Sequence, residues 1–131
     1  MQVKSSRVYI KKKKKENGFY FYSWFNRFKT NDYTDFYIIY IPYPLIDLKT
    51  FKPITGFDTI ILIFSQSEMK KILSEIKTKN GAQETFFGFG FDNSENIFGA
   101  RGFKKHPNKE FSKYLFDKKI KAIQKKIGYN N

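Results

Sequence analysis

Hydrophobic and polar residues alternate along much of the first half of the chain, and a period of two predicts β-strands. The expected strands are residues 7–14, 19–28, 36–43 and 59–64. Between the first two, Asn17-Gly18 is typical of a two-residue hairpin turn. The first half is therefore expected to be a set of antiparallel strands that begins with a hairpin.

Proline and apolar content set the expected limits of the third and fourth strands. Pro42 and Pro44 are expected to end the third strand, because proline removes a donor from the hydrogen-bond ladder. Residues 44–58, which also contain Pro53, are expected to form a long loop. Residues 59–64 are apolar on both faces, which predicts a central strand.

A helix is expected to follow this fourth strand directly. Ser65 and Glu68 have the spacing of a capping box. The residues after them form one apolar stripe at i, i+3, i+4 and i+7: Met69, Ile72, Leu73 and Ile76. Asn80-Gly81 is expected to stop the helix.

The second half predicts two strands and a last helix. The strands are expected at residues 85–91 and 97–103, and the helix at residues 109–127. At a period of 3.6, the apolar residues of this helix fall on two faces about 130° apart. They are Phe111, Leu115 and Ala122 on one face, and Phe116, Ile120, Ile123 and Ile127 on the other. The helix is therefore expected either to be buried on two sides, as at a dimer contact, or to bend near Asp117.

The order of these elements, ββββα–ββα, predicts an α+β fold in which two helices pack on one face of an antiparallel β-sheet. The other face of the sheet is expected to stay open. A length of 131 residues suits a single domain. Within this domain, residues 1–81 form the ββββα unit and residues 82–131 form the ββα unit.

Charge and composition narrow the class of partner. The 25 Lys and Arg residues outnumber the 12 Asp and Glu residues, which gives a net charge of +13. An anionic partner is expected to screen this charge: nucleic acid first, then an anionic membrane surface or an acidic protein. The chain has no cysteine, which excludes disulfides and thiolate metal sites, and no cofactor is predicted.

The sequence also bears on the cellular location of the protein and on the kind of genome that encodes it. The longest apolar run, residues 60–64, is too short to span a bilayer, so no membrane insertion is expected. No signal peptide is visible at the N-terminus, and a soluble intracellular protein is expected. The heavy use of Lys, Asn, Ile, Phe and Tyr suggests an AT-rich genome, with a virus as one source.

A run of five lysines next to the first hairpin turn is the strongest candidate for phosphate contact: Lys11, Lys12, Lys13, Lys14 and Lys15. Blocks of like charge are commonly solvated arms, and a second alternative is that the lysines protect a sheet edge from pairing. Because the run adjoins a hairpin in a basic chain, phosphate contact is the favoured interpretation.

Aromatic residues follow the lysine run at alternate positions of the second strand. Tyr20, Tyr22 and Trp24 are expected to share one face with Phe28, and Tyr37 or Tyr40 would lie on a neighbouring strand. The opposite face is expected to carry Phe19, Phe21, Phe25 and Arg27. Tyrosine and tryptophan tolerate water better than phenylalanine, so the Tyr and Trp face is interpreted as a platform on which bases stack. The alternative is that this face is the core.

This arrangement of strands and helix resembles the PUR repeat, and more widely the Whirly-PC4-like proteins that bind single-stranded nucleic acid. The resemblance is carried by residues 7–28, where a strand with a lysine-rich end turns through glycine into an aromatic strand. It is also carried by residues 59–77, where an apolar strand leads into an amphipathic helix. The resemblance implies a curved sheet that binds a single strand on its concave face, with two repeats intertwined or in a homodimer.

Two further motifs compete with this interpretation. Gly88-Phe89-Gly90-Phe91 resembles the core of the RNP1 motif of RRM domains, although the glycines equally permit a bend or close packing. Glu68-Met69-Lys70 has the E-x-K spacing of one nuclease class, but Glu68 already has a capping role. The single histidine, His106, has no obvious catalytic partner.

The sequence therefore predicts a non-enzymatic binder of single-stranded DNA or RNA. Its candidate site consists of the five lysines together with Tyr20, Tyr22, Trp24, Arg27, Tyr37 and Tyr40. The alternative is a small basic protein-binding module, such as a viral inhibitor of a host nucleic-acid enzyme.

Overall fold

The computed structural model describes residues 1–11, 18–76, 86–103, 109–126 and 128, and this part of the chain contains seven strands. The strands are β1 (Gln2–Ser5), β2 (Val8–Ile10), β3 (Phe21–Asn26), β4 (Phe36–Ile46), β5 (Pro53–Ser65), β6 (Phe86–Phe91) and β7 (Ile97–Gly99). The helical elements are α1 (Gln66–Glu75), a short 3-10 turn η1 (Ser112–Tyr114) and α2 (Phe116–Lys126). The predicted α+β class is confirmed.

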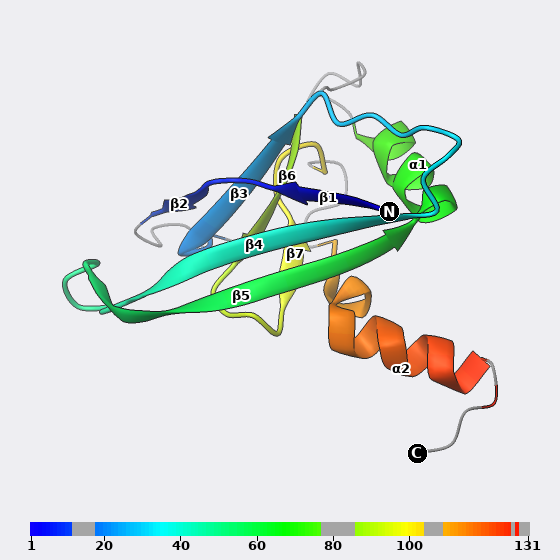
Figure 1. Cartoon of the computed structure of the whole chain (residues 1–131). Coiled ribbons are helices and arrows are strands. Elements are labelled where there is room, and N and C mark those ends of the chain that lie inside the picture. The colour runs from blue at the N-terminus through cyan, green and yellow to red at the C-terminus, as the bar shows by residue number, and fades with distance from the viewer. Residues whose placement is uncertain (12–17, 77–85, 104–108, 127, 129–131) are drawn as a thin grey trace.

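The strands form two sheets instead of the single sheet expected from the sequence (Figure 1). One, the β4 sheet, has the order β1-β4-β5, with β1 parallel and β5 antiparallel to β4. The other, the β3 sheet, has the order β2-β3-β6-β7 and is antiparallel throughout. The β3 sheet therefore combines strands from both units recognised in the sequence.

Residues 44–58 are not the loop predicted from their prolines. β4 continues to Ile46 and β5 begins at Pro53, so the two strands form one long hairpin. β1 pairs with β4 only as far as Tyr40, and beyond that point this edge of β4 has no partner strand among the described residues. A proline can be accommodated there because the donor that it lacks is not needed by a neighbouring strand.

The predicted central position of residues 59–64 is also wrong. β4 is the central strand of its sheet, and β5 lies at the edge. On its free side β5 makes one isolated bridge, between Leu62 and Leu115. Its inward residues Ile60, Leu62 and Phe64 are fully buried in the core, and Ile63 on its outward face is 8% exposed.

Aromatic rings fill the space between the two sheets. Tyr43 on β4 lies 4.8 Å from Phe21 on β3 and 5.0 Å from Phe91 on β6, measured between ring centroids. Phe87 and Phe89 are also fully buried. Each such side chain contributes about 1.5–3 kcal/mol through burial, so these rings are the main force that holds the sheets together.

Helix α1 begins as the sequence predicts. The Ser65 hydroxyl accepts the backbone N–H of Glu68 at 3.2 Å, and the Glu68 carboxylate accepts the backbone N–H of Ser65 at 2.8 Å. The expected apolar stripe packs into the core through Met69, Ile72 and Ile76. The stop signal at Asn80-Gly81 lies outside the described residues.

The C-terminal segment is not one helix from residue 109. The backbone N–H of Gly99 donates to Lys109, and that of Phe111 donates to Ile97, so this segment first runs along β7. The helix α2 begins only at Phe116, and it projects from the molecule beside β5 (Figure 1). The two apolar faces predicted for one helix thus begin in different elements, with Phe111 in the core and Phe116 on α2. The predicted strand over residues 97–103 likewise ends early, at Gly99.

Within the described residues, no helix is both long and apolar enough to cross a membrane.

Candidate functional site

The outward face of the β3 sheet carries a group of aromatic side chains. Strand alternation buries Phe21, Ser23 and Phe25 and leaves Tyr22 and Trp24 half-buried on the other side. The rings of Tyr22 and Trp24 are stacked, with centroids 5.3 Å apart and an interplanar angle of 22°. Tyr9 lies directly opposite Tyr22 on β2 and is 43% exposed. Together with Phe19, these residues are called the aromatic platform below.

Glycines on β6 make room for the platform. Gly88 pairs with Trp24 and Gly90 pairs with Tyr22 across the β3–β6 ladder. A Cβ atom at Gly88 would lie 2.1 Å from Cε3 of Trp24, and one at Gly90 would lie 2.3 Å from Cδ2 of Phe19. The rings therefore lie against the β6 backbone, where any side chain would displace them.

The same strand decides the role of the Gly-Phe-Gly-Phe motif. Phe89 and Phe91 are fully buried and face the β4 sheet, so their rings are not available to stack on bases. The glycines serve close packing, which was the alternative interpretation of the motif. Its similarity to RNP1 therefore does not extend to exposed aromatic rings.

Cations lie over the rings on this face. The Lys11 ammonium is 5.1 Å from the centroid of the Tyr22 ring, and the Arg7 guanidinium is 5.6 Å from that of Tyr9. At the other end of the ladder, the Arg101 guanidinium is 4.5 Å from the ring centroid of Phe86. Such contacts hold positive charge close to the aromatic surface.

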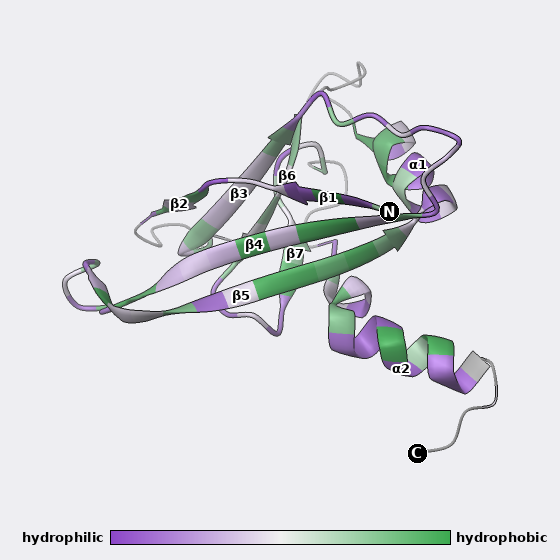
Figure 2. Ribbon diagram, in the orientation of Figure 1, coloured by the Kyte–Doolittle hydropathy of each residue, from purple (hydrophilic) through white to green (hydrophobic). Residues whose placement is uncertain are grey.

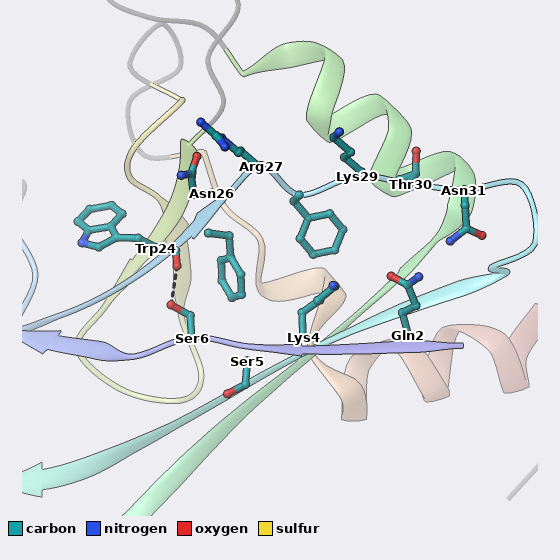
Figure 3. Close-up of a pocket in the computed structure, with 12 residues that line it drawn as sticks. Gln2, Lys4, Ser5, Ser6, Trp24, Asn26, Arg27, Lys29, Thr30 and Asn31 are labelled. Atoms are coloured by element: carbon teal, nitrogen blue, oxygen red, sulfur yellow. Dashed lines mark hydrogen bonds between the residues drawn. The ribbon is translucent and has the colours of Figure 1, made fainter.

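A basic groove of about 490 Å³ adjoins the platform at Trp24 (Figure 3). Its walls are β1, the end of β3 and the segment of residues 27–31. Lys4, Arg27 and Lys29 line it, and among the described residues no Asp or Glu does. The remaining lining residues are neutral and polar, except for Trp24, Phe25 and Phe28. The groove is therefore suited to anionic groups, and it adjoins a residue of the aromatic platform.

Hydrogen bonds hold the walls of the groove in place. The Ser6 hydroxyl donates to the backbone carbonyl of Trp24, which joins the end of β1 to β3 (Figure 3). On the opposite wall, the Asn31 backbone N–H donates to the Tyr37 hydroxyl at 2.9 Å. The Gln66 side chain, at the start of α1, donates to the Asn31 carbonyl at 2.7 Å. The groove is thus tied to both the core and α1.

Four of the residues expected in the site lie together or side by side. Tyr22 and Trp24 share the platform, Lys11 lies over Tyr22, and Arg27 lines the groove next to Trp24. Lys12, Lys13, Lys14 and Lys15 lie outside the described residues.

Tyr20 does not share a face with Tyr22, contrary to the expectation from alternation. It packs against the core, with its ring centroid 6.0 Å from that of Phe51 in the β4–β5 turn. Phe19, predicted to be buried with Phe21, lies on the platform instead. The reason is that β3 begins only at Phe21, so strand alternation does not extend back to these two residues.

A similar break at the other end of β3 moves Phe28 inward. Arg27 has a φ of 53°, outside the β region, and this ends the alternation. Phe28 therefore packs against the core, with its ring centroid 5.6 Å from that of Tyr37, instead of lying beside Trp24. The same turn places Arg27 in the basic groove.

Tyr37 and Tyr40 do not belong to the platform. Tyr37 is fully buried between the sheets, and its hydroxyl is used by Asn31. Tyr40 is 40% exposed, but it lies on the outward face of the β4 sheet. Both predictions assumed that β4 pairs with β3, whereas the two strands belong to different sheets.

Sequence reasoning missed several residues of the site. The expected hairpin pairs the strand of Tyr9 with β3, but a two-residue turn at Asn17-Gly18 would place Tyr9 opposite Asn26, whereas its partner is Tyr22. Lys4 and Lys29 carried no signal, since β1 has no clear alternation and residues 27–31 form no regular element.

Two residues were weighed for a catalytic role, Glu68 and His106. Glu68 has a structural role. The Glu68 carboxylate caps α1 and forms an ion pair with Lys119 on α2. Burial raises the pKa of this carboxyl, but the hydrogen bonds from Lys119 and from the Ser65 backbone outweigh it and leave the pKa below its ordinary value. His106 lies outside the described residues. In the described part of the chain, no three His, Asp or Glu side chains form a cluster able to hold a metal ion.

No protein-family model, curated protein or solved structure matches this chain.

Proposed function

We propose that this protein binds single-stranded nucleic acid, with bases stacked on the aromatic platform and phosphates held by the cations around it. The observation that carries the proposal is the position of Trp24. Its ring stacks on the Tyr22 ring, and Trp24 is also one of the residues that line the basic groove. Bases and phosphates alternate along a strand at short range, so a site for both needs aromatic and cationic groups side by side.

The expected free energies of base stacking and phosphate contact are large enough for binding of a single strand. Stacking of one base on an aromatic side chain contributes about 1–3 kcal/mol, and each phosphate contact adds a salt-dependent term. Three cations line the groove, and Lys11, the first of five consecutive lysines in the sequence, lies over the platform. A single strand is favoured over a duplex because only unpaired bases expose their flat faces to protein rings.

The decisive experiment is titration of the protein with oligo-dT and oligo-U while the fluorescence of its single tryptophan is followed. Binding is expected to quench Trp24. Trp24→Ala, followed by fluorescence anisotropy of labelled oligonucleotide, is expected to weaken binding by about 1–3 kcal/mol. The slope of log affinity against log salt should stay the same, because stacking releases no counterions.

Phe57→Ala is a matched control, because Phe57 is an aromatic residue of the β4 sheet that is 77% exposed. This variant should bind like the unmodified protein. If Trp24→Ala and Phe57→Ala bind alike, the platform is not the site. If the unmodified protein ignores single-stranded DNA, single-stranded RNA and duplex DNA, the proposed function is overturned in favour of a protein-binding role.

A further inference from the structure

Trp24 has positive charge on both sides of it in the β3 sheet. The end of β1 lies along one edge of β3, where the Ser6 hydroxyl donates to the Trp24 carbonyl, and β1 contributes Lys4 to the basic groove. β6 lies along the other edge of β3, and Arg101 lies beyond β6. The groove therefore supplies the cations on the first side, and Arg101 supplies the cation on the second.

Backbone hydrogen bonds fix the position of Arg101. The backbone N–H of Gly88 donates to the Arg101 carbonyl at 3.0 Å, and that of Ala100 donates to the Gly88 carbonyl at 2.9 Å. Gly88 pairs with Trp24, and the indole lies against it, since a Cβ at Gly88 would be 2.1 Å from the ring atom Cε3. Neighbouring strands are about 4.8 Å apart, so the Arg101 backbone lies about 10 Å from that of Trp24. The three residues form one row across the sheet, and the middle one carries no side chain.

The Arg101 side chain lies on the same face as the aromatic platform. Phe86 alternates along β6 with the fully buried Phe87, so it points outward like Gly88. The guanidinium of Arg101, an exposed residue, is 4.5 Å from the centroid of the half-buried Phe86 ring. A guanidinium that lies over a ring through its flat face can still bind a phosphate through the N–H groups at its edge. Phe86 therefore orients Arg101 for an anion next to Trp24.

The surface between these cations is aromatic and of intermediate hydropathy. Figure 2 shows β3 in paler colours than the strongly hydrophobic C-terminal half of β5. Tyrosine and tryptophan tolerate water when nothing is bound and stack on bases when a strand is present. This surface is therefore suited to a base that has a phosphate on each side.

We propose that a nucleic-acid strand crosses the β3–β6 ladder at Trp24, with one phosphate in the basic groove and the next phosphate at Arg101. This inference rests on the proposed function and adds the course of the strand to it. The nucleotide stacked on Trp24 has a phosphate held on each side. The ligand is then an internal stretch of a single strand, because a free nucleoside monophosphate or an unphosphorylated strand end has a phosphate on one side only.

Arg101→Gln tests the second phosphate contact by titration of labelled oligo-dT at several salt concentrations. Its affinity should fall at least about tenfold. The log–log salt slope should become shallower by about 0.7, the value for one phosphate contact on a single strand. Quenching of Trp24 at saturation should be unchanged, because a base still stacks there. Arg101→Lys keeps the charge and should restore the slope, while its affinity stays below that of the unmodified protein because an ammonium lacks the planar fork.

Lys113→Gln is the matched control, because the Lys113 ammonium also lies over a ring, 5.2 Å from the centroid of Tyr114. Tyr114 packs against Phe64 of β5, outside the β3 sheet. This variant should change the salt slope less than Arg101→Gln does. Equal slopes for the two variants overturn the proposed course of the strand, and the proposed function survives if Trp24→Ala still weakens binding. An unmodified protein that binds no oligo-dT overturns both.

Melting curves separate this role from a structural one. If Arg101 only held the sheet together, Arg101→Gln would lower the melting temperature and leave the salt slope as it is, and this result would also contradict the proposal.

A circular oligo-dT tests whether an internal stretch is bound, because a circle has no ends. It is expected to bind as tightly as linear oligo-dT of the same length, with the same quenching of Trp24. A linear strand that binds while its circle does not would show that the site takes a strand end, and the proposed course would be wrong.

Discussion

Single residues on β6 decide where the exposed rings of the candidate site can lie. Gly88 pairs with Trp24 and Gly90 pairs with Tyr22. β6 therefore has no side chain at the two positions opposite these aromatic residues of β3. The space above Gly88 is bounded by the Trp24 ring and by the Ser23 carbonyl, which is 2.6 Å from an added Cβ. A backbone oxygen cannot move aside as a flexible side chain does.

Gly88→Ala is therefore expected to destabilise the protein by about 1–3 kcal/mol through overpacking. The Trp24 ring should be pushed into solvent, which shifts its fluorescence to longer wavelength and weakens oligonucleotide binding. Gly90→Ala is the matched control, because its Cβ would meet Phe19 and not Trp24. It should lower stability without shifting the emission. An unshifted emission in Gly88→Ala would show that Trp24 does not lie on that glycine.

At the scale of elements, the basic groove exists because β1 and the segment after β3 are held at a fixed separation. β1 contributes Lys4, and the segment after the turn at Arg27 contributes Lys29. The Lys4 ammonium lies 5.9 Å from the ring centroid of Phe28, so its charge lies over an aromatic ring of another residue that lines the groove.

The double variant Lys4→Gln with Lys29→Gln is expected to weaken binding of every oligonucleotide sequence alike. The log–log salt slope should become shallower by about 0.7 for each phosphate of a single strand that the protein no longer neutralises. Lys71→Gln with Lys113→Gln removes the same charge from exposed positions outside the groove and should change the slope less. Equal slopes for the two double variants would mean that the groove does not contact phosphates.

At the scale of the whole molecule, ion pairs join the C-terminal segment to α1. Lys119 on α2 pairs with Glu68, and Lys109 pairs with Glu75. The pKa of the Glu68 carboxyl is lowered on folding from an ordinary value of 4.5, despite burial, by Lys119 and the Ser65 backbone N–H. The folded protein therefore binds this proton less readily than the unfolded chain. The ionised Glu68 carboxylate therefore stabilises the folded protein. This stabilisation is fully present above pH 4.5 and is lost as the pH falls through the lowered pKa of Glu68.

Lys119→Met is expected to destabilise the protein at pH 7 by about 1–3 kcal/mol, because it leaves a partly buried carboxylate without its charged partner. The variant should also lose less stability on acidification below pH 4.5, as the pKa of Glu68 moves back up. Lys70→Met is the control, because it removes an ion pair with Asp32 in which both side chains are well exposed. Denaturant unfolding at several pH values measures both effects. Equal stability loss in the two variants would show that the Glu68–Lys119 pair is no more than a surface pair.

Features that depend on near neighbours in the chain were predictable from the sequence. The capping box at Ser65 and Glu68 and the stripe from Met69 to Ile76 were both confirmed, because a helix is decided by contacts three or four residues apart. The pairing of β2 with β3 and the outward positions of Tyr22 and Trp24 were predictable from a turn signal and strict alternation, whereas the register that places Tyr9 opposite Tyr22 was not. The net positive charge is also a property of sequence alone.

Features that depend on which strands pair were decided by the tertiary structure. The sequence does not state that β3 pairs with β6, that β4 belongs to another sheet, or that β1 completes it. Those pairings bury Tyr37, move Tyr40 to the far face and bring Lys4 to Trp24. The physical reason is that burial and packing reward any apolar surface that fits, at any separation along the chain, whereas propensity and periodicity record only local preferences. Sequence thus determined the capped start of α1, the alternation within β3 and the charge of this protein, and packing between distant strands decided which of its aromatic and basic residues meet.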